Sequence, residues 1–322
     1  MKNLILPNRG DALGSNFIVK LGAFIYGKIN NIKIFYKKFI KDEGQWGTYS
    51  FREDSMFMEP FFKFCKEKEE NLEYIDYYDD GKGGNLRIQQ AAPVVEMKQD
   101  LISYFNQNYK NKFYKIIEEI AIKRNYQLPW KDNKKIICIH LRLGDNASHD
   151  GSNMQDYDGR ASGTYIKDLI ENNKLNNYSK TEMIKQSHEY YRRNKIKFNK
   201  NDMPDRQCCI SIIKLENLII KLKKEYPAKE IHVISLFTNN SNHKKYRNLC
   251  EKYNIKIHSN KDIDYDLWLL INSEILILSK SNYSLVAGYF HQGNKVYYPI
   301  WGTFVSTGLN TIYDKSNWEN YI

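Results

Sequence analysis

Residues 134–145 read KKIICIHLRLGD, an apolar run that passes directly into imidazole, guanidinium, glycine and carboxylate groups. Buried strands of parallel sheets are short continuous apolar runs, so the run ending at Ile139 predicts such a strand. Open α/β sheets bind their ligands at the carboxyl ends of these strands. We therefore expect His140, Arg142 and Asp145 at the mouth of a ligand-binding cleft.

The side chains that follow the run alternate in direction. His140 and Arg142 are two residues apart, so an extended backbone points both to one face. Leu141 and Leu143 then point to the other face, into the core. Arg142 can fork onto a phosphate with two parallel N–H bonds, and Gly144 lets the backbone turn closely around that group. The alternative is an ordinary strand end with a structural ion pair between Arg142 and Asp145.

The composition is that of a globular protein long enough for two domains, with 322 residues of which 42% are hydrophobic. No window holds the roughly 18 apolar residues that a membrane helix requires. The amino-terminal sequence MKNLILPNRGD is too short and polar for a signal peptide. We expect a soluble cytoplasmic protein without an integral membrane segment, and leave peripheral membrane contact open.

Cysteine spacing and charge narrow the classes of site and partner. The five cysteines show no CxxC spacing, which favours free thiols over disulfides or a zinc site. A net charge of +11 is compatible with nucleic-acid binding, but the lysines are dispersed among Asn, Ile and Tyr, as codon bias in an AT-rich genome produces. We expect no nucleic-acid partner, because a phosphate-bearing small substrate suits a positive field equally well.

The amino-terminal part, residues 1–130, predicts one α/β domain that ends near Pro129. The predicted elements are a strand at 4–6, a helix at 16–29, a strand at 31–40 and a long helix at 94–126. Gly14 lies in the turn before the first helix, and Asn16 begins that helix. Such a turn brings backbone N–H groups and the positive end of a helix toward an anion.

Residues 131–310 predict a second, Rossmann-like domain with a parallel sheet, because strands alternate with helices. After the strand at 136–140 we expect helices at 208–225, 243–253, 265–272 and 283–291, and strands at 231–237, 255–258, 275–278 and 296–298. The polar segment 146–206 is an irregular insertion that we expect to frame an acceptor site. Residues 311–322 form a carboxyl-terminal tail.

Two strand ends in this second half carry groups suited to a nucleotide. Ser279, Ser281 and Ser284 lie between a strand and a helix, where hydroxyls and helix N–H groups can cradle a diphosphate facing Arg142. Asp264, with an aspartate two residues to either side, precedes another helix and could accept hydrogen bonds from a guanine. The alternative at both places is ordinary helix capping.

The string from His140 to Asp145 resembles the HxRxGD motif of the GDP-fucose-dependent fucosyltransferases, most closely the α1,2-fucosyltransferase family. A second match lies late in the chain, where Asp264-Tyr-Asp-Leu267 and SEILILSKSNYSLVAGYF resemble that family's block of an acidic start, an apolar strand and a Ser-rich turn. Leu13-Gly14-Ser-Asn16-Phe17 resembles the amino-terminal GxGNQ-type loop, although the Asn is displaced and no Gln follows. Leu143 stands where the α1,2 branch usually has a second Arg.

The resemblance implies a GT-B architecture, in which two Rossmann-like domains enclose a cleft and the carboxyl-terminal one binds the donor. It also implies inversion at the anomeric carbon and no required metal or other cofactor. Arg142 would bind the β-phosphate, His140 would lie against the donor, Asn16 would face the sugar, and Gly14 would be among the donor-binding residues. Ser279, Ser281 and Ser284 would line the diphosphate.

We therefore expect transfer of fucose from GDP-fucose to a hydroxyl of a glycan acceptor. Asp150 and Asp145 are the candidate bases, because both lie close to Arg142 in the sequence. A donor with another GDP-linked deoxyhexose, such as rhamnose, remains an alternative. The strings Asp156-Tyr-Asp158 and Asp264-Tyr-Asp266 leave open a metal-dependent UDP-sugar transferase. A non-catalytic module that binds nucleotide sugars is the alternative from another class.

Overall fold

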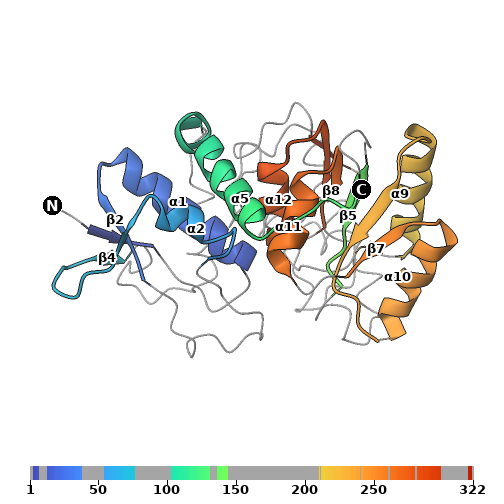
Figure 1. Ribbon diagram of the computed structural model, residues 1–322, viewed down its shortest axis with the longest axis horizontal. Coiled ribbons are helices and arrows are strands. Elements are labelled where there is room, and N and C mark those ends of the chain that lie inside the picture. The colour runs from blue at the N-terminus through green and yellow to red at the C-terminus, as the bar shows by residue number, and fades with distance from the viewer. Residues whose placement is uncertain are drawn as a thin grey trace, which may run out of the picture. The chain divides into compact units, whose positions relative to one another are not determined.

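The computed structural model contains two parallel sheets with helices (Figure 1). It describes residues 3–6, 13–37, 54–76, 103–130, 136–143, 210, 212–239, 241–259, 262–279, 281–298 and 318–320. The chain divides into two compact units, residues 1–127 with 307–313 (unit 1) and residues 128–306 with 314–322 (unit 2). The α/β class with two Rossmann-like sheets is thus confirmed. In the described ranges, no helix is both long and apolar enough to cross a membrane.

The sheet of unit 1 has the strand order β3-β2-β1-β4, and every neighbouring pair is parallel. Its strands are β1 (Asn3–Ile5), β2 (Lys33–Tyr36), β3 (Lys66–Glu67) and β4 (Ile75–Asp76). The helices are α1 (Leu13–Ile29), α2 (Glu59–Phe62) and α5 (Asn111–Lys123), the last preceded by the π-helical turn η1 (Asn106–Lys110). Helix α1 is the crossover that joins the parallel neighbours β1 and β2.

The helices of unit 1 pack together through buried phenylalanines. The Phe61 ring of α2 lies 5.1 Å from Phe17 of α1 and 5.1 Å from Phe113 of α5, measured between centroids. Phe24 of α1 lies 5.4 Å from Phe113 with its ring turned nearly edge-on. All four side chains are fully buried, and such edge-to-face pairs add to the stabilisation from burial. This aromatic cluster attaches α2 and α5 to the crossover helix.

The sheet of unit 2 has the strand order β10-β9-β8-β5-β6-β7, and every neighbouring pair is parallel. Its strands are β5 (Ile137–His140), β6 (Ile231–Ile234), β7 (Lys256–His258), β8 (Ile275–Ile277), β9 (Lys295–Tyr298) and β10 (Trp318–Asn320). Its helices are α9 (Ile212–Glu225), α10 (Ser241–Lys252), α11 (Ile263–Ile271) and α12 (Asn282–Phe290). Figure 1 shows α9 and α10 on one side of the sheet and α11 and α12 on the other.

Strand β5 is the topological switch point of this sheet. The chain passes from β5 to β6 and β7 on one side, then returns to β8 and β9 on the other. Because parallel crossovers are right-handed, the reversal places the helices of the two halves on opposite faces. In open α/β sheets, ligands bind outside the carboxyl ends of the strands at such a point. The favoured place in unit 2 is therefore beyond the ends of β5 and β8.

Alternate side chains of β5 point to opposite faces of the sheet. Ile137 and Ile139 belong to the buried cluster with residues of α9 and α10, and the two leucines after the strand belong to it as well. Cys138 and His140 point to the opposite face, because the Cys138 Sγ lies 4.0 Å from the carbonyl of Leu269 on α11. The predicted placement of Leu141 and Leu143 in the core is confirmed.

Three helices end at an asparagine in the left-handed conformation. Asn31, Asn125 and Asn254 have φ values of 52°, 54° and 50° after α1, α5 and α10. In each case the next N–H donates to the carbonyl five residues earlier, at 2.9, 2.9 and 2.8 Å. This is the bond that closes a Schellman motif, and Asn tolerates the required backbone better than most residues.

Several predicted boundaries need correction. Helix α1 begins at Leu13, so Gly14 and Asn16 lie within its first turns and not in or beside a loop. Within the predicted helix 94–126, the described part is helical from 103 to 123 and includes the π-helical turn. Residues 311–322 supply the edge strand β10, which pairs with β9. An edge strand of three residues is too short to contain an apolar run, so the sequence pattern does not predict it.

Candidate functional site

The ends of β5 and β8 are joined by a side-chain hydrogen bond. Ile139 pairs with Ile277 in the register of these strands, which brings the following residues of both strands together. The His140 Nδ1 lies 2.6 Å from the Ser279 Oγ. Both side chains are buried, with 9% of His140 and 5% of Ser279 exposed. Two residues predicted separately for the site therefore meet at the switch point.

The imidazole of His140 is neutral at physiological pH. Burial, and then the positive charge of Arg142, lower the pKa of His140 to about 3. A neutral ring has one donor and one acceptor nitrogen, and one of them already bonds Ser279. Among the described residues, the hydrogen bond found for the imidazole is the one between Nδ1 and Ser279. Arg142 itself is half-buried, two residues beyond His140.

The serine-rich turn between β8 and α12 is held by its own hydroxyls. The Ser284 Oγ accepts the Ser279 N–H at 3.2 Å and can donate to the carbonyl of Ser279 or of Ser281, both 3.0 Å away. Ser281 is the N-cap of α12 and accepts the Tyr283 N–H at 3.2 Å. The capping interpretation of Ser281 is thus confirmed. All three serines are buried, so the turn is preformed around the first turn of α12.

Tyr283 belongs to this cluster, although the sequence did not single it out. Its ring lies 5.2 Å from the His140 ring at an interplanar angle of 35°, and its hydroxyl donates to the Ile263 carbonyl at 2.7 Å. The sequence signal was present, because an aromatic residue follows Ser281 by two positions in a turn that already holds three predicted residues. Its contact with the first residue of α11 has no sequence signal.

Asp264 lies in the first turn of α11, one residue inside the helix and not before it as predicted. Asp262 is the N-cap and accepts the N–H groups of Asp264 and Tyr265 at 3.1 and 3.4 Å. Asp264 is 1% exposed, and a carboxylate is favoured there by the positive end of the helix. The structure thus places one capping and one buried carboxylate at this helix terminus.

In unit 1, helix α1 carries the predicted Gly14 and Asn16, and both are buried. One turn further, Lys20 is 1% exposed, and burial lowers its pKa to about 7. The nearby Cys65 opposes that shift, and burial raises the pKa of the Cys65 thiol to about 12. A lysine four residues after Asn16 on an otherwise apolar helix face was the sequence signal for this buried amine.

The candidate bases Asp145 and Asp150 lie outside the described residues, as do Gly144, the insertion 146–206 and the string Asp156-Tyr-Asp158. The second acidic string, Asp264-Tyr-Asp266, occupies the first turn of α11. Within the described ranges, no group of three His, Cys, Asp or Glu residues is arranged to hold a metal ion. Asp264 and Asp266 therefore find no third ligand among these residues.

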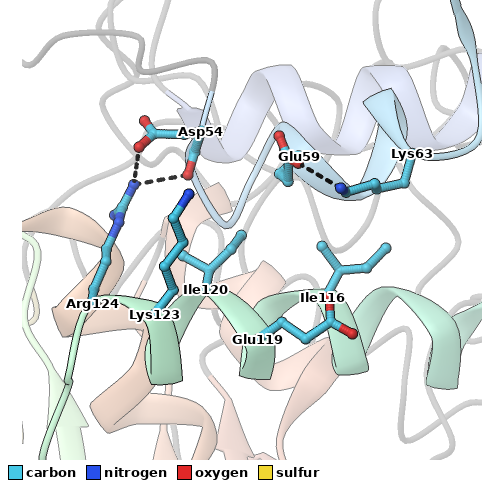
Figure 2. Close-up of a pocket in the computed structure, with 8 residues that line it drawn as sticks. All are labelled: Asp54, Glu59, Lys63, Ile116, Glu119, Ile120, Lys123 and Arg124. Carbon is cyan, nitrogen blue, oxygen red and sulfur yellow. Dashed lines mark hydrogen bonds and ion pairs between the residues drawn. The ribbon is translucent and has the colours of Figure 1, made fainter.

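Unit 1 also contains a cavity of about 140 Å³ between α2 and α5 (Figure 2). It is lined by Asp54, Glu59, Lys63, Ile116, Glu119, Ile120, Lys123 and Arg124. Arg124 pairs with Asp54 at 2.9 Å, and Lys63 pairs with Glu59 at 3.4 Å. These ion pairs neutralise most of the charge at the rim, and the cavity contains none of the residues predicted for the site.

A pair of histidines joins β6 and β7 at the other side of the sheet of unit 2. The His232 Nδ1 lies 2.9 Å from the His258 Nε2, and the rings are stacked with centroids 5.0 Å apart. Glu230 contacts the opposite nitrogen of His232 at 3.4 Å and pairs with Lys256 at 2.7 Å. Glu230 lies at Nε2 of His232, whereas His258 lies at Nδ1 of the same ring. Glu230 and the two imidazoles therefore do not face one common metal position.

Comparisons with known proteins give distant matches only. No protein-family model matches the sequence, and no curated protein matches it significantly. Similar solved structures include POFUT1 in complex with GDP, with 13% identity, 89% of this chain and 93% of that chain covered, and a TM-score of 0.43. For POFUT1 in complex with GDP-fucose the values are 12%, 89%, 92% and 0.41. Values this low establish no common activity, so a function has to come from this chain's own residues.

The His232–His258 pair predicts a pH-dependent loss of stability. Burial, His232 and Lys256 lower the pKa of His258 in the folded protein to about 4, whereas an unfolded histidine titrates near 6.5. The folded state therefore binds fewer protons, and its stability is full above about pH 6.5 and falls as the pH drops to about 4. We expect His258→Gln to reduce this loss by about 1–2 kcal/mol, allowing for partial exposure, in urea unfolding across this range. Equal pH dependence in both proteins would contradict the assignment, because His140 is common to both.

Proposed function

We propose that the chain is a glycosyltransferase that moves fucose from GDP-fucose to a hydroxyl of a glycan acceptor. The observation that supports this most is the bond between His140 and Ser279 at the switch point of unit 2, beside Arg142 and the first turn of α12. A nucleoside diphosphate suits such a place, because helix N–H groups and a guanidinium both favour its charge. The resemblance of residues 140–145 to the HxRxGD motif points to a GDP-sugar.

In this proposal, the phosphates bind between Arg142 and the serine-rich turn. Arg142 forms two parallel N–H bonds to the β-phosphate, and the first turn of α12 supplies backbone N–H groups. Ser279, Ser281 and Ser284 hold that turn in place through the bonds described above. The charge that develops on the leaving diphosphate is then stabilised by groups that need no rearrangement.

His140 orients the donor and does not act as an acid in this proposal. A pKa of about 3 leaves the imidazole neutral at physiological pH, so the imidazolium that could protonate the leaving group is not formed. The bond from Nδ1 to Ser279 holds the orientation of the ring, and Nε2 contacts the donor. Asp264 accepts hydrogen bonds from guanine, and Asn16 with Gly14 faces the sugar.

The transfer is a single displacement with inversion and without a metal ion. The acceptor oxygen bonds to the anomeric carbon while the bond from that carbon to the leaving diphosphate breaks, and a carboxylate takes the proton of the acceptor hydroxyl. Asp150 and Asp145 are the proposed bases, because both follow Arg142 closely in the sequence. Residues 1–130 and the insertion 146–206 would bind the acceptor, and residues 131–310 outside that insertion would bind the donor.

Substitution of Arg142 tests the donor site. We expect the wild-type protein to bind GDP and GDP-fucose in preference to UDP, with a chelator present. Arg142→Ala should weaken GDP binding about 10- to 100-fold, because hydrogen bonds to a charged group are lost. Isothermal titration of both proteins with the three nucleotides measures this.

Arg247→Ala is the matched control, because it removes the same charge from an exposed position on α10 of the same unit. Its GDP affinity should equal that of the wild type. A preference for UDP or a requirement for a divalent cation would favour the metal-dependent transferase instead. Binding of GDP-fucose without transfer to any acceptor would favour a non-catalytic module.

The base is tested separately by turnover. Asp150→Asn keeps the size of the side chain but cannot accept the proton, so we expect a loss of turnover of about 10²- to 10⁴-fold with GDP affinity unchanged. Asp145→Asn, assayed alongside, shows which of the two carboxylates carries the effect. An unchanged turnover number in Asp150→Asn would exclude Asp150 as the base.

A further inference from the structure

One residue, Tyr283, links three elements of the candidate site. Its backbone N–H donates to the capping hydroxyl of Ser281, which begins α12. Its ring lies against His140 at the end of β5, with centroids 5.2 Å apart. Its hydroxyl crosses to α11 and donates to the carbonyl of Ile263 at 2.7 Å.

The two helix termini that Tyr283 joins have opposite chemistry. The first turn of α12 presents N–H groups and hydroxyls, which suit phosphate oxygens. The first turn of α11 carries the carboxylates of Asp262 and Asp264, which suit hydrogen-bond donors such as the N–H groups of a nucleobase. A nucleotide that uses both termini depends on the distance between them.

The hydroxyl of Tyr283 is suited to hold that distance. It bonds the first residue of α11, which lies between the capping Asp262 and the buried Asp264. The ring is in turn held against His140, whose imidazole is bonded to Ser279. Ser279 lies at the other end of the serine-rich turn between β8 and α12, hereafter the phosphate turn. A shift of α11 relative to α12 would therefore stretch a short bond to a partly buried hydroxyl.

We infer that Tyr283 is a positioning residue that sets nucleobase specificity, because its hydroxyl holds the carboxylates of α11 in register with the phosphate turn of α12. The inference rests on the proposed function, in which these two termini bind the base and the diphosphate of one donor. It predicts that loss of the hydroxyl affects ligands that span both termini and spares ligands that contact only the phosphate turn.

Tyr283→Phe tests the inference, because it keeps the ring against His140 and removes only the hydroxyl. We expect the dissociation constant for GDP to rise about three- to tenfold, the effect of one lost neutral hydrogen bond. The dissociation constant for inorganic pyrophosphate, measured by competition against a fluorescent GDP analogue, should stay unchanged. The ratio of GDP to UDP affinity should fall by the same factor as GDP affinity.

Tyr253→Phe is the matched control, because Tyr253, in the turn after α10, donates its hydroxyl to Glu216 of α9 at 2.8 Å. The same atom is removed from unit 2, away from the ends of β5 and β8. Binding of GDP and of pyrophosphate should both equal the wild type. Circular dichroism of the two variants checks that each is folded.

The possible failures are distinguishable. If wild-type protein does not bind GDP, the proposed function fails, and the role of Tyr283 fails with it. If wild type binds GDP and Tyr283→Phe binds it equally well, only the inference about Tyr283 is overturned. Equal weakening of GDP and pyrophosphate would also overturn it, because Tyr283 would then support the phosphate turn alone.

Discussion

The hydrogen bond between His140 and Ser279 is the contact on which the site depends. It joins residues 139 positions apart, at the ends of β5 and β8. These are the neighbouring strands at which the strand order of unit 2 reverses. Both side chains are buried, so removal of either partner would leave a polar atom unpaired at a cost of about 1–3 kcal/mol. The bond engages Nδ1 of the imidazole, and the proposed contact with the donor is made by Nε2. One hydrogen bond therefore joins both the strands at the switch point and two side chains of the candidate site.

The central strands were predictable because their physical signal is local. Buried parallel strands are typically continuous apolar runs. Strand β8 is apolar throughout, β5 is apolar up to His140, and β6 is apolar apart from His232. The short strands β3, β4 and β10 were missed, because edge strands of two or three residues are held by backbone pairing and need no apolar run. The start of α1 was placed too late for a related reason. Leu13 is buried in the core, and such tertiary burial can extend a helix past a sequence boundary.

The site was predictable in its residue types and less so in its contacts. The spacing of Ser279, Ser281 and Ser284 around a strand end indicated a turn with hydroxyl ligands, and the structure shows these hydroxyls bonded within that turn. The contact of Tyr283 with α11 depends on how two helices pack, which no local pattern reveals. The pairing of His232 with His258 similarly requires the register of β6 and β7, since these residues are 26 positions apart. Spacing along the chain indicates which groups are available, and the fold decides which of them meet.

Nitrogen NMR of the histidine side chains most directly tests whether the end of β5 is the nucleotide site. His140 lies at the proposed site, while His232 and His258 form an internal reference at the other side of the same sheet. We predict that GDP shifts the imidazole nitrogen signals of His140 and leaves those of His232 and His258 in place. We also predict that His140 stays neutral down to about pH 4, as its pKa of about 3 requires. Unchanged His140 signals at saturating GDP, or a titration near the ordinary histidine pKa of about 6.5, would contradict the proposed site.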